Sequence, residues 1–174
     1  IGLPLKQAFT DLIPMPDEMG NLCADTYRRI FNEYNAVYTV PPFPNVLETL
    51  HLLSQQGFTL TIASSRSNRS LIEFVENMNL QEHISYVLGA DDVTQAEPHP
   101  EPVLKTLEKF GCTPDDALVV GDTWYDIEMG RRAGVRTCGV TYGNGTREEL
   151  MNAGADFLMD DFNELLKTAF TSFT

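Results

Sequence analysis

The sequence is poor in basic residues. It contains 12 lysines and arginines against 25 aspartates and glutamates, so the formal net charge is −13 at pH 7. Because the negative charge is spread along the chain rather than gathered in a tail, it disfavours binding to nucleic acid or to an anionic membrane surface. We therefore expect neither nucleic acid nor a membrane as a partner.

Cysteine and histidine are also scarce. The three cysteines lie far apart without a C-x-x-C pair, which is typical of reduced thiols in the cytosol. The three histidines lack metal-ligand spacing. The sequence has neither a run of about eighteen apolar residues nor a charged and then apolar leader. These features predict a soluble, cytoplasmic protein, and they leave its oligomeric state open.

The first part of the chain has a helical pattern. Between residues 16 and 38, apolar residues recur every three or four positions, which predicts an amphipathic helix. A shorter helix is expected over residues 5–12. Three of the four residues from Pro41 to Pro44 are prolines, and they interrupt helical geometry because proline lacks a backbone donor. We place a domain boundary here, between residues 1–41 and 42–174.

The second part alternates between helices and short apolar strands. Helices are expected over 46–56, 71–78, 102–110, 126–133 and 147–153 and from about 162, and strands over 58–63, 86–88, 117–120, 135–140 and 156–159. Strands separated by helices are typical of right-handed β-α-β units. The sequence therefore predicts an α/β fold with a parallel sheet covered on both faces. We interpret Gly143-Asn144-Gly145 as a loop tip.

Polar residues follow two of the expected strands, where ligands of open parallel sheets bind. The strand over 58–63 is followed by Ser64, Ser65 and Arg66. Their hydroxyls and guanidinium suit the oxygens of a phosphate group. This segment is therefore a candidate for binding a phosphorylated substrate.

The strand over 117–120 is followed by two carboxylates. Asp122 comes after Gly121, and Asp126 lies four residues later, about one helical turn, so both can face one site. Two such anions repel each other unless a cation or proton intervenes, and Mg²⁺ binds one or two carboxylates together with waters and phosphate oxygens. Alternatively, Asp122 or Thr123 caps the following helix and Asp126 is an acid of its first turn.

Together these segments resemble the haloacid dehalogenase superfamily, in particular its branch of phosphoglycolate phosphatase-like and β-phosphoglucomutase-like proteins. The run from Gly121 to Asp126, with Gly130 and Ala133-Gly134 after it, is similar to the family's fourth motif, whose first aspartate helps to hold magnesium. Ser64 is similar to the hydroxyl residue of the second motif, which contacts the transferring phosphoryl group.

The resemblance implies a Rossmann-like core and a helical cap, and residues 1–41 are similar to the later part of such a cap. It implies a magnesium-dependent phosphatase of small phosphorylated metabolites, with Asp122 and Asp126 at the metal and Ser65 and Arg66 at the substrate. In such enzymes an aspartate attacks phosphorus to form an aspartyl-phosphate, and a second aspartate is the general acid and base.

The nucleophile segment of the family is absent from this sequence. The family's D-x-D-G-T segment has no counterpart, and the chain begins at Ile1 rather than methionine, in a region expected to be helical. We therefore expect the 174 residues to be a fragment of a longer gene product, with the nucleophile upstream of Ile1. Because the family's nucleophile strand lies centrally in the sheet, its absence should expose apolar strand faces and unpaired ladder groups.

The third motif also departs from the family. Glu97-Pro98-His99-Pro100 puts Glu97 at the catalytic position where the family commonly has a lysine. Replacing a cation by an anion about 4 Å from a phosphate changes the interaction by several kcal/mol. Arg66 or Lys105 are candidates to supply the missing cation. Two alternatives stay open: a non-catalytic module that binds phosphoryl groups or metal, and a sugar-phosphate mutase.

Overall fold

The structure is a computed structural model that describes residues 5–35 and 41–167. The chain divides into two compact units, Leu3–Pro42 and Phe43–Thr174, and each unit is described by itself. Within the described ranges, no helix has both the length and the apolar character needed to cross a bilayer.

The first unit contains two helices, α1 (Leu5–Leu12) and α2 (Asp17–Asn35). Two acidic residues in the first turn of α2 interact favourably with the positive end of the helix dipole. A Cβ atom on Gly20 would lie only 2.9 Å from the Cγ2 atom of Thr10, so glycine allows the two helices to approach closely. Both helices confirm the predictions, although the predicted end of the second one lies outside the described residues.

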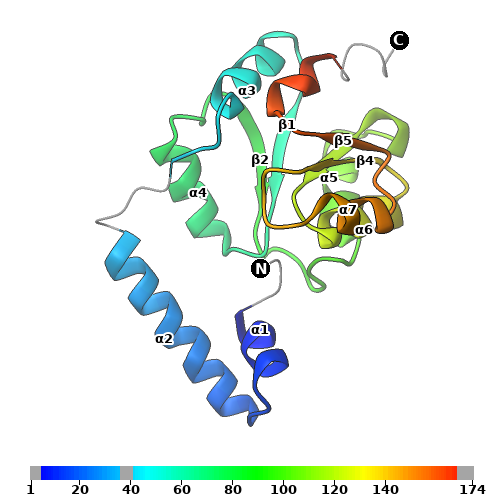
Figure 1. Cartoon of the computed structure of the whole chain (residues 1–174). Coiled ribbons are helices and arrows are strands. Elements are labelled where there is room, and N and C mark those ends of the chain that lie inside the picture. The colour runs from blue at the N-terminus through cyan, green and yellow to red at the C-terminus, as the bar shows by residue number, and fades with distance from the viewer. Residues whose placement is uncertain (1–4, 36–40, 168–174) are drawn as a thin grey trace. The chain divides into compact units, whose positions relative to one another are not determined.

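The second unit alternates helices and strands, as predicted (Figure 1). Its elements are α3 (Val46–Gln55), β1 (Leu60–Ala63), α4 (Asn68–Asn77), β2 (Ile84–Leu88), α5 (Glu101–Phe110), η1 (Pro114–Asp116), β3 (Leu118–Gly121), α6 (Trp124–Ala133), β4 (Arg136–Val140), α7 (Arg147–Asn152), β5 (Phe157–Met159) and η2 (Phe162–Glu164). Most ends differ from the predictions by one or two residues. The helix α4 begins three residues earlier because the hydroxyl of Ser67 caps it by accepting a bond from the Ser70 amide.

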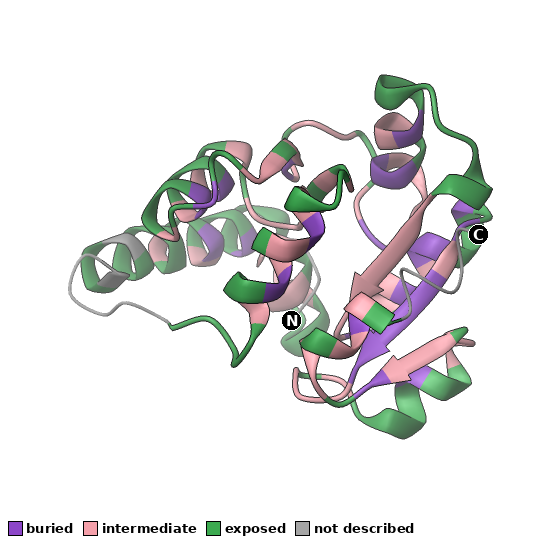
Figure 2. Ribbon diagram, turned by 90° about the horizontal axis from the view of Figure 1, so that it is seen from above, coloured by how far each residue is buried: buried purple, intermediate pink, exposed green. Residues whose placement is uncertain are grey.

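All strand pairs are parallel, which confirms the α/β class. β1 pairs with β2, and β4 lies between β3 and β5. The helix α4 packs on β2, α6 packs on β3 and β4, and α7 packs on β5. The strand β4 is the most continuously buried one (Figure 2), with Cys138 fully buried in a core that also contains Leu53 and Met159.

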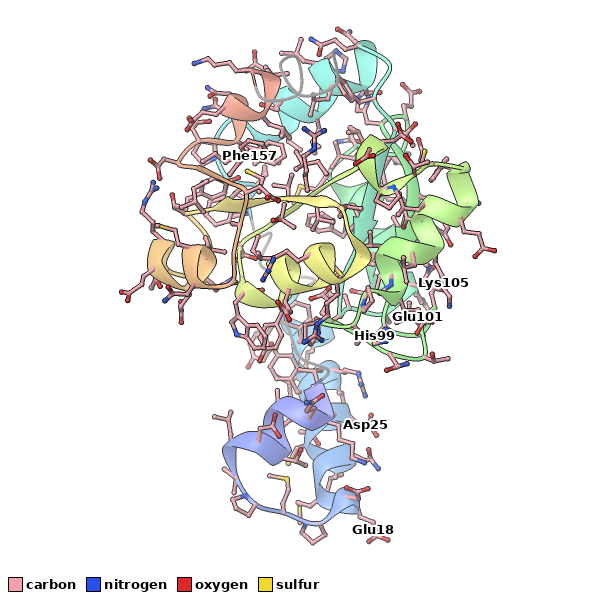
Figure 3. The ribbon with its side chains drawn as sticks, turned by 90° about the vertical axis from the view of Figure 1, so that its right-hand side faces the viewer. Glu18, Asp25, His99, Glu101, Lys105 and Phe157 are labelled. Carbon is pink, nitrogen blue, oxygen red and sulfur yellow. The ribbon has the colours of Figure 1, made fainter. Side chains whose placement is uncertain are left out.

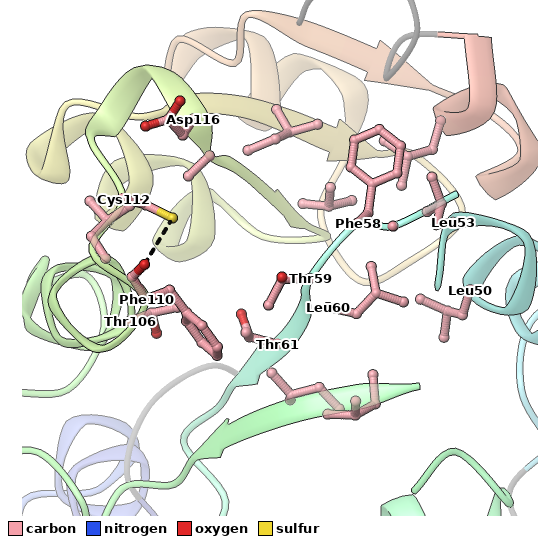
Figure 4. Close-up of a pocket in the computed structure, with 18 of the residues that line it drawn as sticks. Leu50, Leu53, Phe58, Thr59, Leu60, Thr61, Thr106, Phe110, Cys112 and Asp116 are labelled. Carbon is pink, nitrogen blue, oxygen red and sulfur yellow. Dashed lines mark hydrogen bonds between the residues drawn. The ribbon is translucent and has the colours of Figure 1, made fainter. Parts of the chain in front are cut away.

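The strands form two sheets rather than one. In the described part of the chain, β1 and β3 each pair on one side only. A cavity of about 510 Å³ is lined by both strands (Figure 4), and its walls are largely apolar, with side chains such as Phe58, Leu60, Leu118 and Val120. The edges of β1 and β3 in the described residues are therefore bordered by apolar side chains.

Candidate active site

The turn after β3 is fixed by a capping box at the start of α6. Thr123 is the N-cap residue, and the Oδ2 atom of Asp126 accepts bonds from its amide at 2.9 Å and from its hydroxyl at 2.7 Å. A Cβ atom on Gly121 would lie 2.1 Å from the Cβ atom of Asp126, so this turn requires glycine. Thr123 therefore caps the helix and Asp126 is an acid of its first turn, which is the arrangement given as the alternative to metal binding.

Asp122 is held by a loop that follows β4. Its Oδ2 atom accepts bonds from the backbone amide of Asn144 at 2.8 Å and from the Nδ2 atom of the same residue at 2.7 Å. The amide of Gly145 donates to the Asp122 carbonyl at 2.8 Å. Both side-chain bonds use Oδ2, so neither of them occupies the other carboxylate oxygen, Oδ1. The segment interpreted as a loop tip is thus part of this site.

Glu97 joins the two aspartates in a group of three carboxylates. Its side chain is buried, with 8% of the residue exposed. This burial is the largest cause that raises the pKa of Glu97 to about 8, and the negative charges of Asp126 and Asp122 contribute to the same rise. Burial is also the main cause that raises the pKa of Asp126. The charges of the two aspartates that the sequence predicted for the metal therefore act on Glu97.

This carboxylate group has the chemistry of a site for a hard cation. Burial is the largest cause of the raised pKa of Glu97, and Asp126 and Asp122 add a negative potential, which a divalent ion would relieve. Mg²⁺ needs only one or two carboxylates and takes its other ligands from water and substrate. Among residues 5–35 and 41–167, no group of three or more histidine, cysteine, aspartate or glutamate side chains has the geometry to hold a metal by itself. Asp122 with its Oδ1 atom is the best candidate ligand.

The residues predicted to bind phosphate lie at the end of β1, in the other sheet. The Oγ atom of Ser64 accepts a bond from the amide of Arg66 at 3.3 Å. The guanidinium of Arg66 donates to the Oγ atom of Ser70 at 2.8 and 3.2 Å and lies 5.6 Å from the ring centre of Phe74. Ser65 is half-buried in the same turn. These bonds are local, and they do not connect the turn to the carboxylates.

Lys105 was a candidate for the missing cation of the third motif. Its ammonium forms an ion pair with Glu101 at 2.9 Å and donates to the carbonyl of Asp92 at 2.6 Å. Figure 3 shows Glu101 and Lys105 together on α5, with His99 just before the helix. The Nδ1 atom of His99 accepts a bond from the Glu101 amide at 3.2 Å. Lys105 thus forms an ordinary i,i+4 ion pair along its own helix.

Comparison with known proteins identifies the family. The model of the haloacid dehalogenase-like hydrolases matches residues 1–140. The chain belongs to this family. The assignment of Asp122 and of the capping box at Thr123 to the fourth motif of this family stays a prediction.

Individual relatives confirm the branch. The chain is 36% identical over 174 residues to the protein named "Probable phosphatase IndB" of Dickeya dadantii, and the match covers 97% of this chain and 75% of that protein. It is 35% identical over 124 residues to the phosphoglycolate phosphatase of Salmonella paratyphi A, covering 71% of this chain but only 49% of that enzyme. The chain thus spans about half of the phosphoglycolate phosphatase.

A solved structure confirms the fold. The crystal structure of a predicted phosphatase from Clostridium acetobutylicum superimposes with a TM-score of 0.86 at 27% sequence identity, and the match covers 97% of this chain and 78% of that chain. The chain therefore has the Rossmann-like α/β fold of haloacid dehalogenase-like hydrolases.

Proposed function

We propose that the natural polypeptide containing this chain is a cytoplasmic, magnesium-dependent phosphatase of small phosphorylated metabolites. The observation that carries the proposal is the Asp122 carboxylate, which is held through Oδ2 at the end of β3 beside the negative charges of Asp126 and Glu97. The relatives named as phosphatases support the same reaction class.

The residues of this chain would have distinct roles in that reaction. Asp122 would hold Mg²⁺, which neutralises charge on the transferring phosphoryl group when it is bound. Asp126 would keep the turn in place through its bonds to Thr123. Ser64 would contact the phosphoryl group, and Ser65 and Arg66 would bind the substrate from the end of β1 by donating hydrogen bonds to phosphate oxygens.

The nucleophile in this proposal is an aspartate upstream of Ile1. Its strand would enter the cavity lined by β1 and β3, where it would pair with both edges and join the two sheets. The aspartate would attack phosphorus to form an aspartyl-phosphate, and a second aspartate would protonate the leaving oxygen and then activate water. Residues 1–41 would belong to a helical cap.

A second candidate is a non-catalytic module that binds phosphoryl groups or metal. It is favoured by Glu97, which is buried beside Asp122 and Asp126 at the position where the family commonly has a lysine. A carboxyl group at this place supplies no positive charge to a phosphate group, and once ionised it opposes phosphate binding unless a cation lies between them. The same scaffold would then hold a ligand without turning it over.

The test is magnesium-dependent release of inorganic phosphate by the natural polypeptide, measured on small phosphomonoesters that include glucose phosphates. We expect release that a chelator abolishes and that Asp122→Asn reduces on the order of a hundredfold. Asp115→Asn, at an exposed position before β3, is the matched control and should retain activity. Magnesium binding without turnover would indicate the binding module, and interconversion of glucose phosphates without phosphate release would indicate a mutase.

A further inference from the structure

The loop Gly143–Gly145 contacts Asp122 although it lies 22 residues away along the chain. We infer that Asn144 is a positioning residue, which orients the Asp122 carboxylate so that Oδ1 is presented to a divalent cation. This inference rests on the proposed function. It adds a residue that lies outside the fourth motif identified in the sequence.

The two donors of Asn144 converge on one atom. Its backbone amide and its side-chain Nδ2 lie 2.8 and 2.7 Å from the Oδ2 atom of Asp122. Hydrogen bonds to an ionised carboxylate are about twice as strong as bonds between neutral groups. Rotation of the carboxylate about its Cβ–Cγ bond would break both bonds, so the pair fixes its orientation. Oδ1 takes no part in either bond.

The flanking glycines allow this contact. A Cβ atom on Gly143 would lie 2.2 Å from the Cβ atom of Asp122 and 2.4 Å from its Oδ2 atom. A Cβ atom on Gly145 would lie 2.5 Å from the Asp122 carbonyl oxygen. Both distances are far below van der Waals contact, so any side chain at either position would push the loop away. The glycine-asparagine-glycine spacing thus fits the turn at Asp122.

The loop is attached to both the backbone and the side chain of Asp122. The bond from the Gly145 amide to the Asp122 carbonyl, at 2.8 Å, already joins the two backbones. The Asn144 side chain adds a second attachment, and this one ends on the carboxylate that would bind the cation. Removing the amide while keeping the backbone bonds should therefore affect the cation more than the fold.

The experiment is a calorimetric titration of the natural polypeptide with Mg²⁺ alone. We expect Asn144→Ala and the similarly sized Asn144→Leu to raise the dissociation constant roughly tenfold or more, the effect typical of losing a partner of a metal ligand. Asn144→Gln keeps the amide donor on a longer side chain and should recover part of the affinity. Asn152→Ala, at an exposed position on α7, should leave the constant unchanged.

Thermal melting in a chelator separates positioning from folding. We expect all four variants to melt cooperatively without metal. A lower melting temperature with an unchanged dissociation constant in Asn144→Ala and Asn144→Leu would overturn the positioning role and leave the metal site intact. Absence of magnesium binding in the parent protein would instead overturn the proposed metal site, and the positioning role with it.

Discussion

The two strand ends that the sequence marked as functional are built in different ways. At the end of β1, the side chain of Ser64 bonds to the amide of Arg66, and the guanidinium of Arg66 donates to Ser70 four positions later. The backbone here is also bonded to the end of β2, through the carbonyl of Leu88 and the amide of Ala90. At the end of β3, Asp122 is held by a loop 22 residues away. The charge of Asp122 also acts on Glu97, which is buried in the segment before α5.

This difference predicts which strand end is more sensitive to substitution. At the β1 end, the side-chain bonds of Ser64 and Arg66 to neighbouring residues can be exchanged for bonds to a phosphate group at small cost. The carboxylates lie where burial strengthens every charge interaction, and several distant segments must be in place for them to have this geometry. We therefore expect changes at the β3 end to have larger effects than changes at the β1 end.

The largest expected effect comes from Gly143→Ala. The added Cβ atom would overlap Asp122 at 2.2 Å, so the loop must move and the free energy of unfolding should fall by about 3 kcal/mol. Gly111→Ala is the matched control, because its φ is 64° but no atom lies within 4 Å of the added Cβ. That variant should lose only about 1 kcal/mol. Urea unfolding measures both, and equal losses would contradict the close contact with Asp122.

Charge reversal at Glu97 should increase turnover. Glu97→Lys in the natural polypeptide replaces a buried carboxyl group by a cation, which favours phosphate binding. We expect magnesium-dependent phosphate release to rise on the order of tenfold or more. Glu108→Lys, at an exposed position on α5, controls for net charge. No gain would mean that Glu97 lies outside the phosphate site or that another cation already serves it.

Glu97 should also make the stability of the metal-free protein depend on pH. Its pKa rises from 4.5 to about 8 on folding, so the folded state holds the proton more tightly than the unfolded state. The free energy of unfolding should therefore fall as the pH rises from 4.5 to about 8, by up to about 1.4 kcal/mol per pH unit. Urea unfolding in a chelator should show no such pH dependence of the free energy of unfolding for Glu97→Gln. An unchanged dependence in this variant would mean that another group causes it.

The smallest effect is expected at the β1 end. Arg66→Ala removes the bonds to Ser70 and one donor for a phosphate group, so it should raise the KM for phosphomonoesters a few-fold and leave kcat nearly unchanged. Arg69→Ala, which removes an exposed i,i+4 pair with Glu73, is the control. A fall in kcat as large as that of Asp122→Asn would remove the contrast between the two strand ends.

The order and type of the elements could be predicted because they depend on local patterns. Buried parallel strands are short apolar runs, and amphipathic helices repeat every three or four residues. The final helix was predicted less well: it begins as the short turn Phe162–Glu164, since Asp161 and Glu164 form a capping box that tightens its start. The division into two sheets depends on which strands pair, and periodicity carries no such information.

The candidate site was predictable only in part. Asp122 could be found because it directly follows a strand and matches a family motif. The role of Asp126 could not be decided from spacing, because an acid at this position of a helix suits both a metal and a capping box. Asn144 was missed because its contact is made across 22 residues. Its flanking glycines were the available signal, since glycine permits close backbone approach as well as a loop.

The most direct test of the account is the affinity of the natural polypeptide for Mg²⁺ with and without the Asp122 carboxylate. Calorimetric titration should show one magnesium site in the parent protein, and Asp122→Asn should weaken it on the order of a hundredfold, while Asp115→Asn should bind as the parent does. Indistinguishable binding by the parent and Asp122→Asn would remove Asp122 from the metal site and contradict the account.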